Sequence, residues 1–239
     1  MPEPTQLTSA AVLKPNTNIA AVTATQRVAA GLRERILNGD MVPGSRIVID
    51  QLRARYKVSH IPLREALRTL EAEGLIVHVA NRGAHVADLS ASEIDGLYEL
   101  RMLLEPALVS KACRIKSAGE EKAARRALKR MAKLDVMNEP VKFQDAHRDF
   151  HASLVLPAAS TVIRKTLEPI WQQVQRYQIR LYQIPCVPNL GGVQHEEILK
   201  AWEAGDSTCG ALLHEHLEDG RVQMTKSVVE SFRMAETAK

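Results

Sequence analysis

Apolar residues recur every three to four positions from Thr25 onward, which is the spacing of a helix with one buried face. The first such segment ends at Asn38-Gly39-Asp40, and two further short helices are predicted within DQLRARY and PLREALRTLEAEG. Alternating apolar residues in LIVHV and AHVAD flank Asn81-x-Gly83, a pattern that predicts a β-hairpin. Three helices followed by a hairpin are the layout of a winged helix-turn-helix, which we place at residues 25–89.

The pattern changes on both sides of this segment. Residues 1–24 mix Pro, Thr, Asn and Ala without sustained periodicity, and we predict a flexible tail there. Residues 90–235 carry no strand pattern, and Ser90-x-x-Glu93 is a capping box that opens a helix from about 91 to 110. Later Gly, Pro and Asn clusters divide the remainder into about six helices. We therefore predict a mainly α protein: a winged helix-turn-helix of three helices plus a β-hairpin wing, followed by an all-α helical-bundle effector domain.

Composition agrees with two domains and argues against export. The chain has 239 residues, 45% of them hydrophobic, which is enough for two buried cores. No run of about 18 uncharged apolar residues and no signal peptide is found, so a cytoplasmic protein without a membrane segment is expected. Cys113, Cys186 and Cys209 form no CxxC pair and are expected to be buried, reduced thiols. Of the net charge of +4, residues 1–88 carry +3, a weak indication of a nucleic-acid-binding module.

The predicted second helix of the helix-turn-helix carries the candidate DNA contacts. In this motif that helix enters the major groove, with the residues near its N-terminus facing bases and phosphates. Ser59 can cap the helix and donate to a phosphate, while Arg64 and Arg68 follow on exposed turns. The alternative is that Arg64-Glu65 and Arg68-Glu71 are only a solvated helix face.

Residues 26–89 closely resemble the DNA-binding domain of the GntR family of bacterial transcriptional regulators. The resemblance rests on the turn ILNGDMVPGSRI, the core VSHIPLREALRTLEAEGLI and the wing tip NRG, in that order. His60 departs from the family, which usually has Arg there, and an imidazole lacks the bidentate Arg-to-guanine geometry. The resemblance implies DNA contacts from the recognition helix, the preceding helix and the wing, namely Arg53, Ser59, His60, Arg64, Arg68 and Arg82.

Four histidines of the second half fall on apolar helix faces. A single inward histidine is more often a hydrogen-bonded core residue than a ligand, but four on three helices leave many polar atoms to satisfy. Imidazoles at i and i+4 can converge on one ion, for which zinc is the first candidate and nickel, manganese or iron are further ones. The inward residues are His147, His151, His195 and His216, whereas His214 is expected to face water.

Residues 91–233 resemble the helical effector-binding FCD domain of the FadR subfamily, through EIDGLYELRMLLEP, HRDFHASL, QHEEILKAWEAGD and LLHEHLEDG. The resemblance implies a metal held by an Asp or Asn and three histidines, which match His151, His195 and His216. His147 occupies the acidic position. Because the carboxylate is lost, the charge of the ion is uncompensated by protein, which favours an anionic ligand.

Arg101 is a further candidate, on a helix that is apolar nearly all round. One interpretation is an internal ion pair with Glu105 at i+4, and the other, implied by the motif YELRMLLE, is a contact with an effector carboxylate. Arg176, Tyr177 and Arg180 either line the effector pocket or cover its outside.

These features favour a regulator that binds a palindromic operator in double-stranded DNA as a homodimer and senses a small organic or sugar acid through a metal and Arg101. A metal-dependent hydrolase or lyase with an accessory DNA-binding module is the alternative. Only the histidines favour it, because no carboxylate shares their faces at a spacing suited to a general base, so we do not expect an enzyme. A third hypothesis is a regulator whose histidines are structural and hold no metal.

Overall fold

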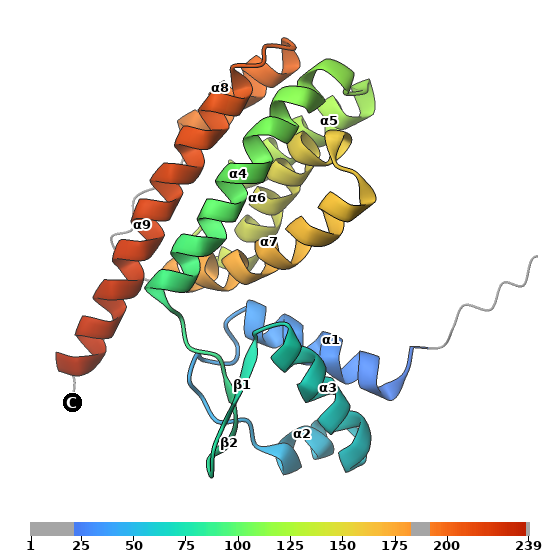
Figure 1. Cartoon of the computed structure of the whole chain (residues 1–239), viewed down its shortest axis with the longest axis vertical. Coiled ribbons are helices and arrows are strands. Elements are labelled where there is room, and N and C mark those ends of the chain that lie inside the picture. The colour runs from blue at the N-terminus through green and yellow to red at the C-terminus, as the bar shows by residue number, and fades with distance from the viewer. Residues whose placement is uncertain (1–21, 183–191, 238–239) are drawn as a thin grey trace, which may run out of the picture.

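The computed structural model describes residues 22–182 and 192–237, which form two bodies joined by residues 87–90 (Figure 1). The first contains α1 (Ala24–Leu37), α2 (Ile49–Tyr56), α3 (His60–Ala72), β1 (Ile76–Val79) and β2 (Gly83–Val86). The second contains α4 (Ala91–Ile115), α5 (Ala118–Met131), α6 (Pro140–Val155), the 3-10 turn η1 (Leu156–Ala158), α7 (Thr161–Tyr182), α8 (Gly192–Glu203) and α9 (Cys209–Thr237). The predicted fold class, a winged helix-turn-helix followed by a helical bundle, is confirmed.

Local sequence signals fix the ends of the N-terminal elements. Thr23 and Gln26 form a capping box that starts α1, so this helix begins within the segment predicted as a tail; residues 1–21 lie outside the described chain. The hairpin pairs Ile76 with Val86 and Val79 with Gly83. Gly83 has φ of +83°, a backbone conformation that favours glycine at the wing tip. A third short extended piece at Arg46 pairs with β2.

The recognition helix α3 is held by one apolar face. Leu63, Ala66, Leu67 and Leu70 are buried in the core that α1, α2 and the hairpin share. Ser59 occupies the N-cap position, as predicted, but its side chain makes no capping hydrogen bond. The hydroxyl of Ser59 is therefore not used by the helix.

The helical domain is organised by a long pairing of α4 with α9, beside which α5 packs on α6 (Figure 1). The helix that opens at Ala91 runs to Ile115, five residues beyond its predicted end, and it continues through Pro106. None of the described helices combines the length and the apolar character that crossing a bilayer requires. Cys113 and Cys209 are free and buried, as expected, and Cys186 lies outside the described residues.

The two bodies meet along α7, which lies next to α1 (Figure 1). Arg176 donates to the Asp88 carbonyl at 3.3 Å and to Glu93 Oε2 at 2.9 Å, and Tyr177 accepts the Ser90 N–H at 3.1 Å. Arg176 and Tyr177 therefore neither line the histidine pocket nor cover it, but bind the inter-domain segment. The predicted capping box at Ser90 is half formed: Ser90 Oγ accepts the Glu93 N–H at 3.3 Å, but the Glu93 carboxylate binds α7 instead of the Ser90 N–H.

Candidate nucleic-acid interface and metal centre

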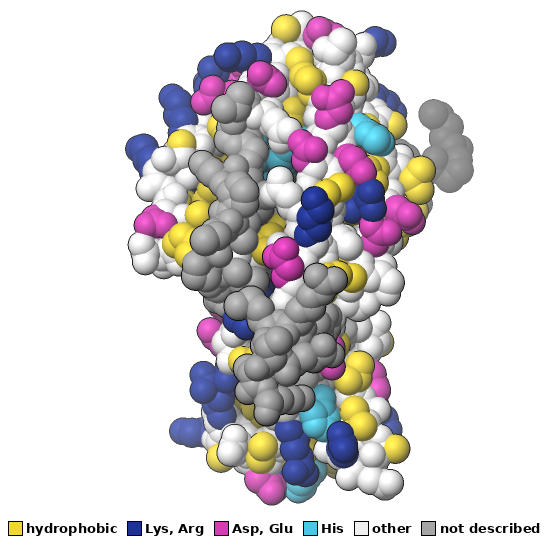
Figure 2. Space-filling view, turned by 90° about the vertical axis from the view of Figure 1, so that its left-hand side faces the viewer, with side chains coloured by type: hydrophobic (Ala, Val, Ile, Leu, Met, Phe, Trp, Pro, Cys, Tyr) yellow, Lys and Arg dark blue, Asp and Glu magenta, His cyan; other side chains and the backbone are white. Residues whose placement is uncertain are grey.

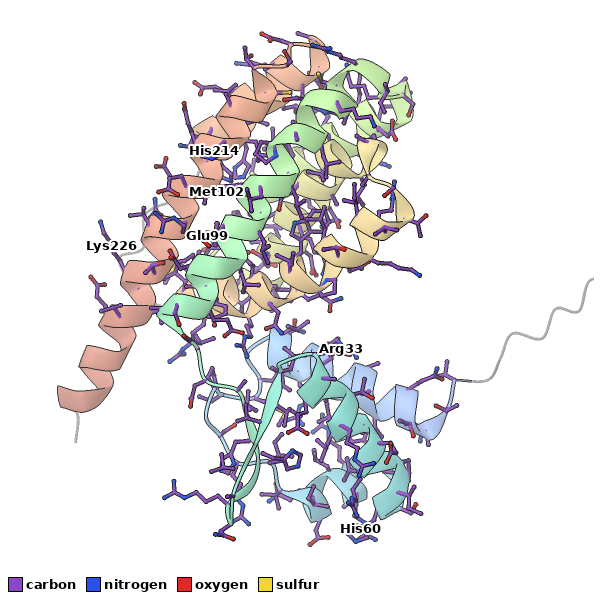
Figure 3. All side chains as sticks on the ribbon, in the orientation of Figure 1. Arg33, His60, Glu99, Met102, His214 and Lys226 are labelled. Atoms are coloured by element: carbon purple, nitrogen blue, oxygen red, sulfur yellow. The ribbon has the colours of Figure 1, made fainter. Side chains whose placement is uncertain are left out.

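The predicted DNA-contact residues lie on one end of the molecule, remote from the helical domain. His60, at the start of α3, is at the far end from that domain (Figure 3). Basic and histidine side chains are frequent at the same lower end in the space-filling view (Figure 2). Ser59, His60, Arg64, Arg68 and Arg82 are all exposed, and Arg53 is half-buried.

These residues differ in whether their side chains already form ion pairs within the protein. Arg68 pairs with Glu65 at 2.9 Å and Arg53 with Asp50 at 3.2 Å, so both guanidiniums are partly neutralised. Among the described residues, Arg64 and Arg82 make no ion pair or hydrogen bond through their side chains, which leaves them available to an external anion. Glu71 on the same helix lies 2.9 Å from His78 Nδ1.

Sequence reasoning overlooked Ile61 in the recognition helix. Its side chain is 75% exposed in the first turn of α3, between His60 and Pro62. An exposed apolar group at this position can contact the methyl group of thymine in the major groove. Helical periodicity could have predicted this exposure, because Ile61 does not lie on the buried face of the helix that Leu63 and Leu67 share.

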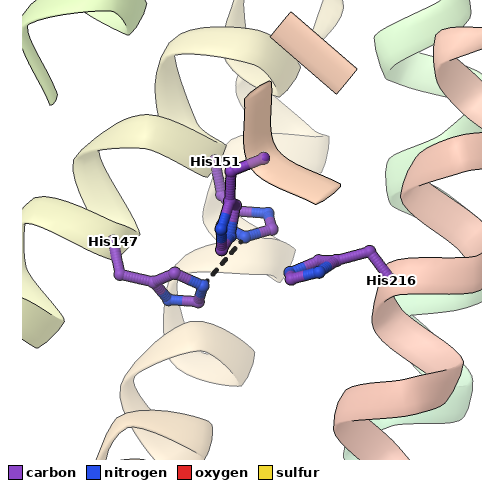
Figure 4. A group of neighbouring side chains, drawn as sticks. His147, His151 and His216 are labelled. Carbon is purple, nitrogen blue, oxygen red and sulfur yellow. Dashed lines mark hydrogen bonds between the residues drawn. The ribbon is translucent and has the colours of Figure 1, made fainter. Parts of the chain in front are cut away.

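In the helical domain, the structure brings the four inward histidines together. His147 and His151 come from α6, His195 from α8 and His216 from α9, and all four are buried. One ring nitrogen of each lies within 4.8 Å of the others. The rings of His147, His151 and His216 converge in Figure 4, where the dashed line joins the Nε2 atoms of His147 and His151 at 3.2 Å.

The protonation state of this cluster suits a metal. Burial, followed by the mutual repulsion of the rings, lowers the pKa of His147 and His216 well below the usual value, and burial also lowers the pKa of His151. Neutral imidazoles keep the lone pair that a metal needs. Four nitrogens at the usual zinc distance lie about 3.4 Å apart in a tetrahedron, so nitrogens separated by up to 4.8 Å need to approach each other by at most about 1.4 Å. The donor set therefore fits a divalent transition metal.

Polar groups lie behind two of the histidine rings, and one of them is hydrogen-bonded to its ring. Gln194 Oε1 lies 3.0 Å from His216 Nδ1, and the Gln194 amide donates to Asp219 at 2.7 Å. On the other side, Glu105 Oε2 lies 3.7 Å from His151 Nδ1, beyond hydrogen-bond length. The hydrogen bond between Gln194 and His216 fixes which nitrogen of the His216 imidazole faces the metal.

Arg101 and Glu105 form a fully buried ion pair, with Arg101 Nε donating to Glu105 Oε1 at 2.6 Å. Trp171 Nε1 donates to the same oxygen at 2.7 Å. Burial opposes ionisation of Glu105, but Arg101 and then His151 outweigh it and hold the pKa of this carboxyl at about 2. Arg101 thus makes the predicted internal pair, and its guanidinium also borders the histidine pocket.

Two small cavities, of about 30 and 10 Å³, flank the histidines and share Arg101, His147 and Gln178 in their walls. Each has room for about one or two water molecules. Their lining is rich in polar side chains that sequence reasoning did not single out, because they come from helices whose packing order periodicity does not give: Tyr98, Gln144, Gln178, Tyr182 and Gln194. Gln144 donates to Gln178 at 2.6 Å in this lining.

Fold and site together define a DNA-binding protein with a separate helical domain for a ligand, and comparison with known proteins gives the family. Residues 24–86 match the bacterial regulatory proteins of the gntR family, and residues 96–219 match the FCD domain. The chain belongs to the gntR family of transcriptional regulators and carries an FCD domain. GntR regulators bind DNA, and FCD domains bind metals and small-molecule effectors.

Individual relatives agree with this assignment. The chain is 32% identical over 197 residues to the HTH-type transcriptional regulator BphR of Paraburkholderia xenovorans, covering 78% of this chain and 79% of the relative. It is 30% identical over 153 residues to the HTH-type transcriptional repressor GlaR of Escherichia coli, covering 62% and 69%. A solved GntR regulator from Rhodococcus sp. RHA1 superposes with a TM-score of 0.75 at 26% identity, over 84% of this chain and 96% of that one. These relatives are regulators and not enzymes, which removes the support for a hydrolase or lyase.

Proposed function

We propose that this regulator binds a palindromic operator as a homodimer and that a divalent metal and a small organic or sugar acid in its helical domain modulate DNA binding. The observation that carries the proposal is the convergence of four buried histidines beside Arg101, in a chain whose recognition helix presents Arg64 unpaired. We further propose Arg53, Ser59, His60, Arg64, Arg68 and Arg82 as DNA contacts.

The DNA contacts are tested by fluorescence anisotropy with the DNA that flanks the gene. We expect salt-sensitive and sequence-selective binding, because phosphate contacts release counterions and base contacts discriminate. Arg64→Ala should weaken binding about tenfold or more. Arg125→Ala is the control, since Arg125 is an exposed arginine on α5 in the helical domain, paired with Glu203. Equal affinity for random DNA would remove the regulator proposal.

We infer that His147, His151, His195 and His216 are the metal ligands, with zinc the first candidate and nickel, manganese or iron further ones. When bound, the ion supplies a double positive charge that holds an anionic oxygen ligand. Arg101 and Glu105 cancel each other, so the protein leaves that charge uncompensated. Elemental analysis of purified protein should give about one metal per chain, lost in His151→Ala and retained in His214→Ala, where the histidine is exposed. A metal content that His151→Ala leaves unchanged would favour structural histidines instead.

The effector is inferred to be a carboxylate that contacts the metal and Arg101. The present cavities hold little more than water, so a larger acid requires the side chains around Gln178 and Tyr98 to move. A ligand that binds only the native protein raises its melting temperature. A thermal-shift screen of organic and sugar acids should therefore find stabilisers whose effect disappears with chelator and in Arg101→Met. Stabilisation that survives chelator would contradict the role of the metal.

Dimerisation is supported by an exposed apolar strip on α4. Leu100 and Leu103 are 45% and 74% exposed on adjacent turns, and Ala107 continues the strip. The strip lies on the exposed side of α4, whereas Pro106 and Ser110, on another face of this helix, contact the start of α9 (Figure 3 shows the pairing of the two helices). A twofold pair formed through this strip would present two recognition helices to the two halves of a palindrome.

A further inference from the structure

A cleft of about 690 Å³ opens between α5, α6 and the start of α7. Its volume is typical of small-molecule pockets, whereas the two cavities beside the histidines measure about 30 and 10 Å³. Asp149, Ala152 and Ser153 line it from the outer face of α6, the face opposite to that of His147 and His151. The cleft and the histidine cluster therefore lie on opposite sides of one helix.

The floor of the cleft is apolar, because small or non-polar side chains separate α5 from α6. This floor consists of Ala123, Ala127, Ala152, Leu156 and Pro157. Such a surface suits the hydrocarbon part of a ligand, since it contains no side chain that must keep contact with water.

The rim of the cleft carries an excess of positive charge. Three arginines and two acids line it, but the protein already uses both acids: Asp149 pairs with Arg130 at 2.8 Å, and Glu120 accepts from the Ser117 N–H and hydroxyl. Arg164 is held by two backbone carbonyls, since its Nε donates to Ala159 at 3.2 Å and its Nη2 to Leu156 at 2.5 Å, and its remaining N–H donors are available to a ligand. Arg126 is exposed and makes no hydrogen bond or ion pair within residues 22–182 and 192–237.

We propose that this cleft binds an amphipathic organic anion, with its hydrocarbon body on the alanine-rich floor and its carboxylate or other acidic group on Arg126 and Arg164. A planar guanidinium with five donors recognises such groups bidentately. This site is separate from the metal-dependent effector site and does not depend on it, because α6 lies between them.

The test is a fluorescence titration of the full-length protein with 8-anilinonaphthalene-1-sulfonate, followed by competition with decanoate. We expect saturable binding at one site per chain and displacement by decanoate. Arg126→Ala should weaken probe binding about tenfold, in keeping with the loss of a charge-assisted contact. Ala123→Trp, which keeps all three arginines but fills the floor, should abolish it. Arg125→Ala is the matched control on the next residue of α5, because Arg125 is outside the cleft and pairs with Glu203.

Two results would overturn the proposal. One is unsaturable binding, or the same affinity in Arg126→Ala and Ala123→Trp as in the parent protein. The other is loss of probe binding in His151→Ala or with chelator, which would assign the probe to the histidine site. Circular-dichroism melts of each variant establish that folded proteins are compared. If Arg126→Ala has a lower melting temperature than the parent protein, Ala123→Trp still tests the cleft independently.

Discussion

Glu105 is a buried carboxylate beside His151, and its ion pair with Arg101 determines how much negative charge it adds to the histidine pocket. The sequence suggested that replacing the acidic ligand by His147 leaves a metal without a protein counter-charge. The structure adds Glu105, 3.7 Å behind His151, but Arg101 neutralises it at 2.6 Å. The buried charges of the pocket therefore sum to zero, and an ion bound there still favours an anionic ligand.

This pair predicts an asymmetric response to mutation. Glu105→Gln keeps an acceptor for Trp171 but leaves Arg101 as an unpaired buried charge, so urea unfolding should show a loss of about 3–5 kcal/mol. Arg101→Met with Glu105→Leu removes both charges and should recover much of that loss. Glu99→Gln on the same helix is exposed and should change stability by less than about 0.5 kcal/mol. A loss below about 1 kcal/mol in Glu105→Gln would show that the pair is not needed.

Helical periodicity predicted the inward direction of His147, His151, His195 and His216, since spacing along a helix fixes the face of each residue. It did not predict Gln178 or Trp171 as neighbours, because they lie on α7 and periodicity contains no information on which helices adjoin. Glu93 shows the same limit. Its carboxylate does not accept the Ser90 N–H as a capping box requires, but binds Arg176, which is 83 residues away in the sequence.

At the scale of elements, α4 and α9 are closely packed where α9 begins. A Cβ on Gly210 would lie 2.0 Å from Ser110 Oγ and 2.7 Å from the Pro106 carbonyl oxygen. The serine can rotate, but the backbone oxygen cannot. Gly210→Ala should therefore destabilise the protein by about 1–3 kcal/mol in a denaturant titration.

Gly96, also inside α4, is the matched control for this prediction. A Cβ there would meet no atom within 4 Å, and its φ is not in the left-handed region. Gly96→Ala should therefore stabilise the helix by about 0.5–1 kcal/mol, through the lower entropy of the unfolded chain. If Gly210→Ala and Gly96→Ala changed the free energy of unfolding in the same direction, close packing at Gly210 would not explain the effect of Gly210→Ala.

At the scale of the whole molecule, α7 links the two bodies. Trp171, Val174 and Gln178 border the histidine cavities, while Arg176 and Tyr177 bind the inter-domain segment and Glu93. A change around the cavities can therefore reach the DNA-binding domain through one helix. Coupling of this kind alters operator affinity only if the ligand binds two arrangements of the protein differently.

The proposed dimer gives a prediction that belongs to the whole assembly. Leu103 is 74% exposed and has Leu100 as an exposed apolar neighbour, so Leu103→Asp would place a charge inside the proposed interface. Sedimentation velocity should then show a monomer, and affinity for a palindrome should fall while affinity for a half-site does not.

Val162→Asp separates this effect from that of a new surface charge. Val162 is also 74% exposed, at the start of α7, but its exposed neighbours one turn on, Lys165 and Thr166, are polar. We expect Val162→Asp to remain a dimer with unchanged operator affinity. Dimers in both variants would place the twofold contact elsewhere on the chain. Monomers in both variants would mean that a new charge anywhere on this domain prevents pairing. Only a difference between these two equally exposed residues would locate the interface on α4.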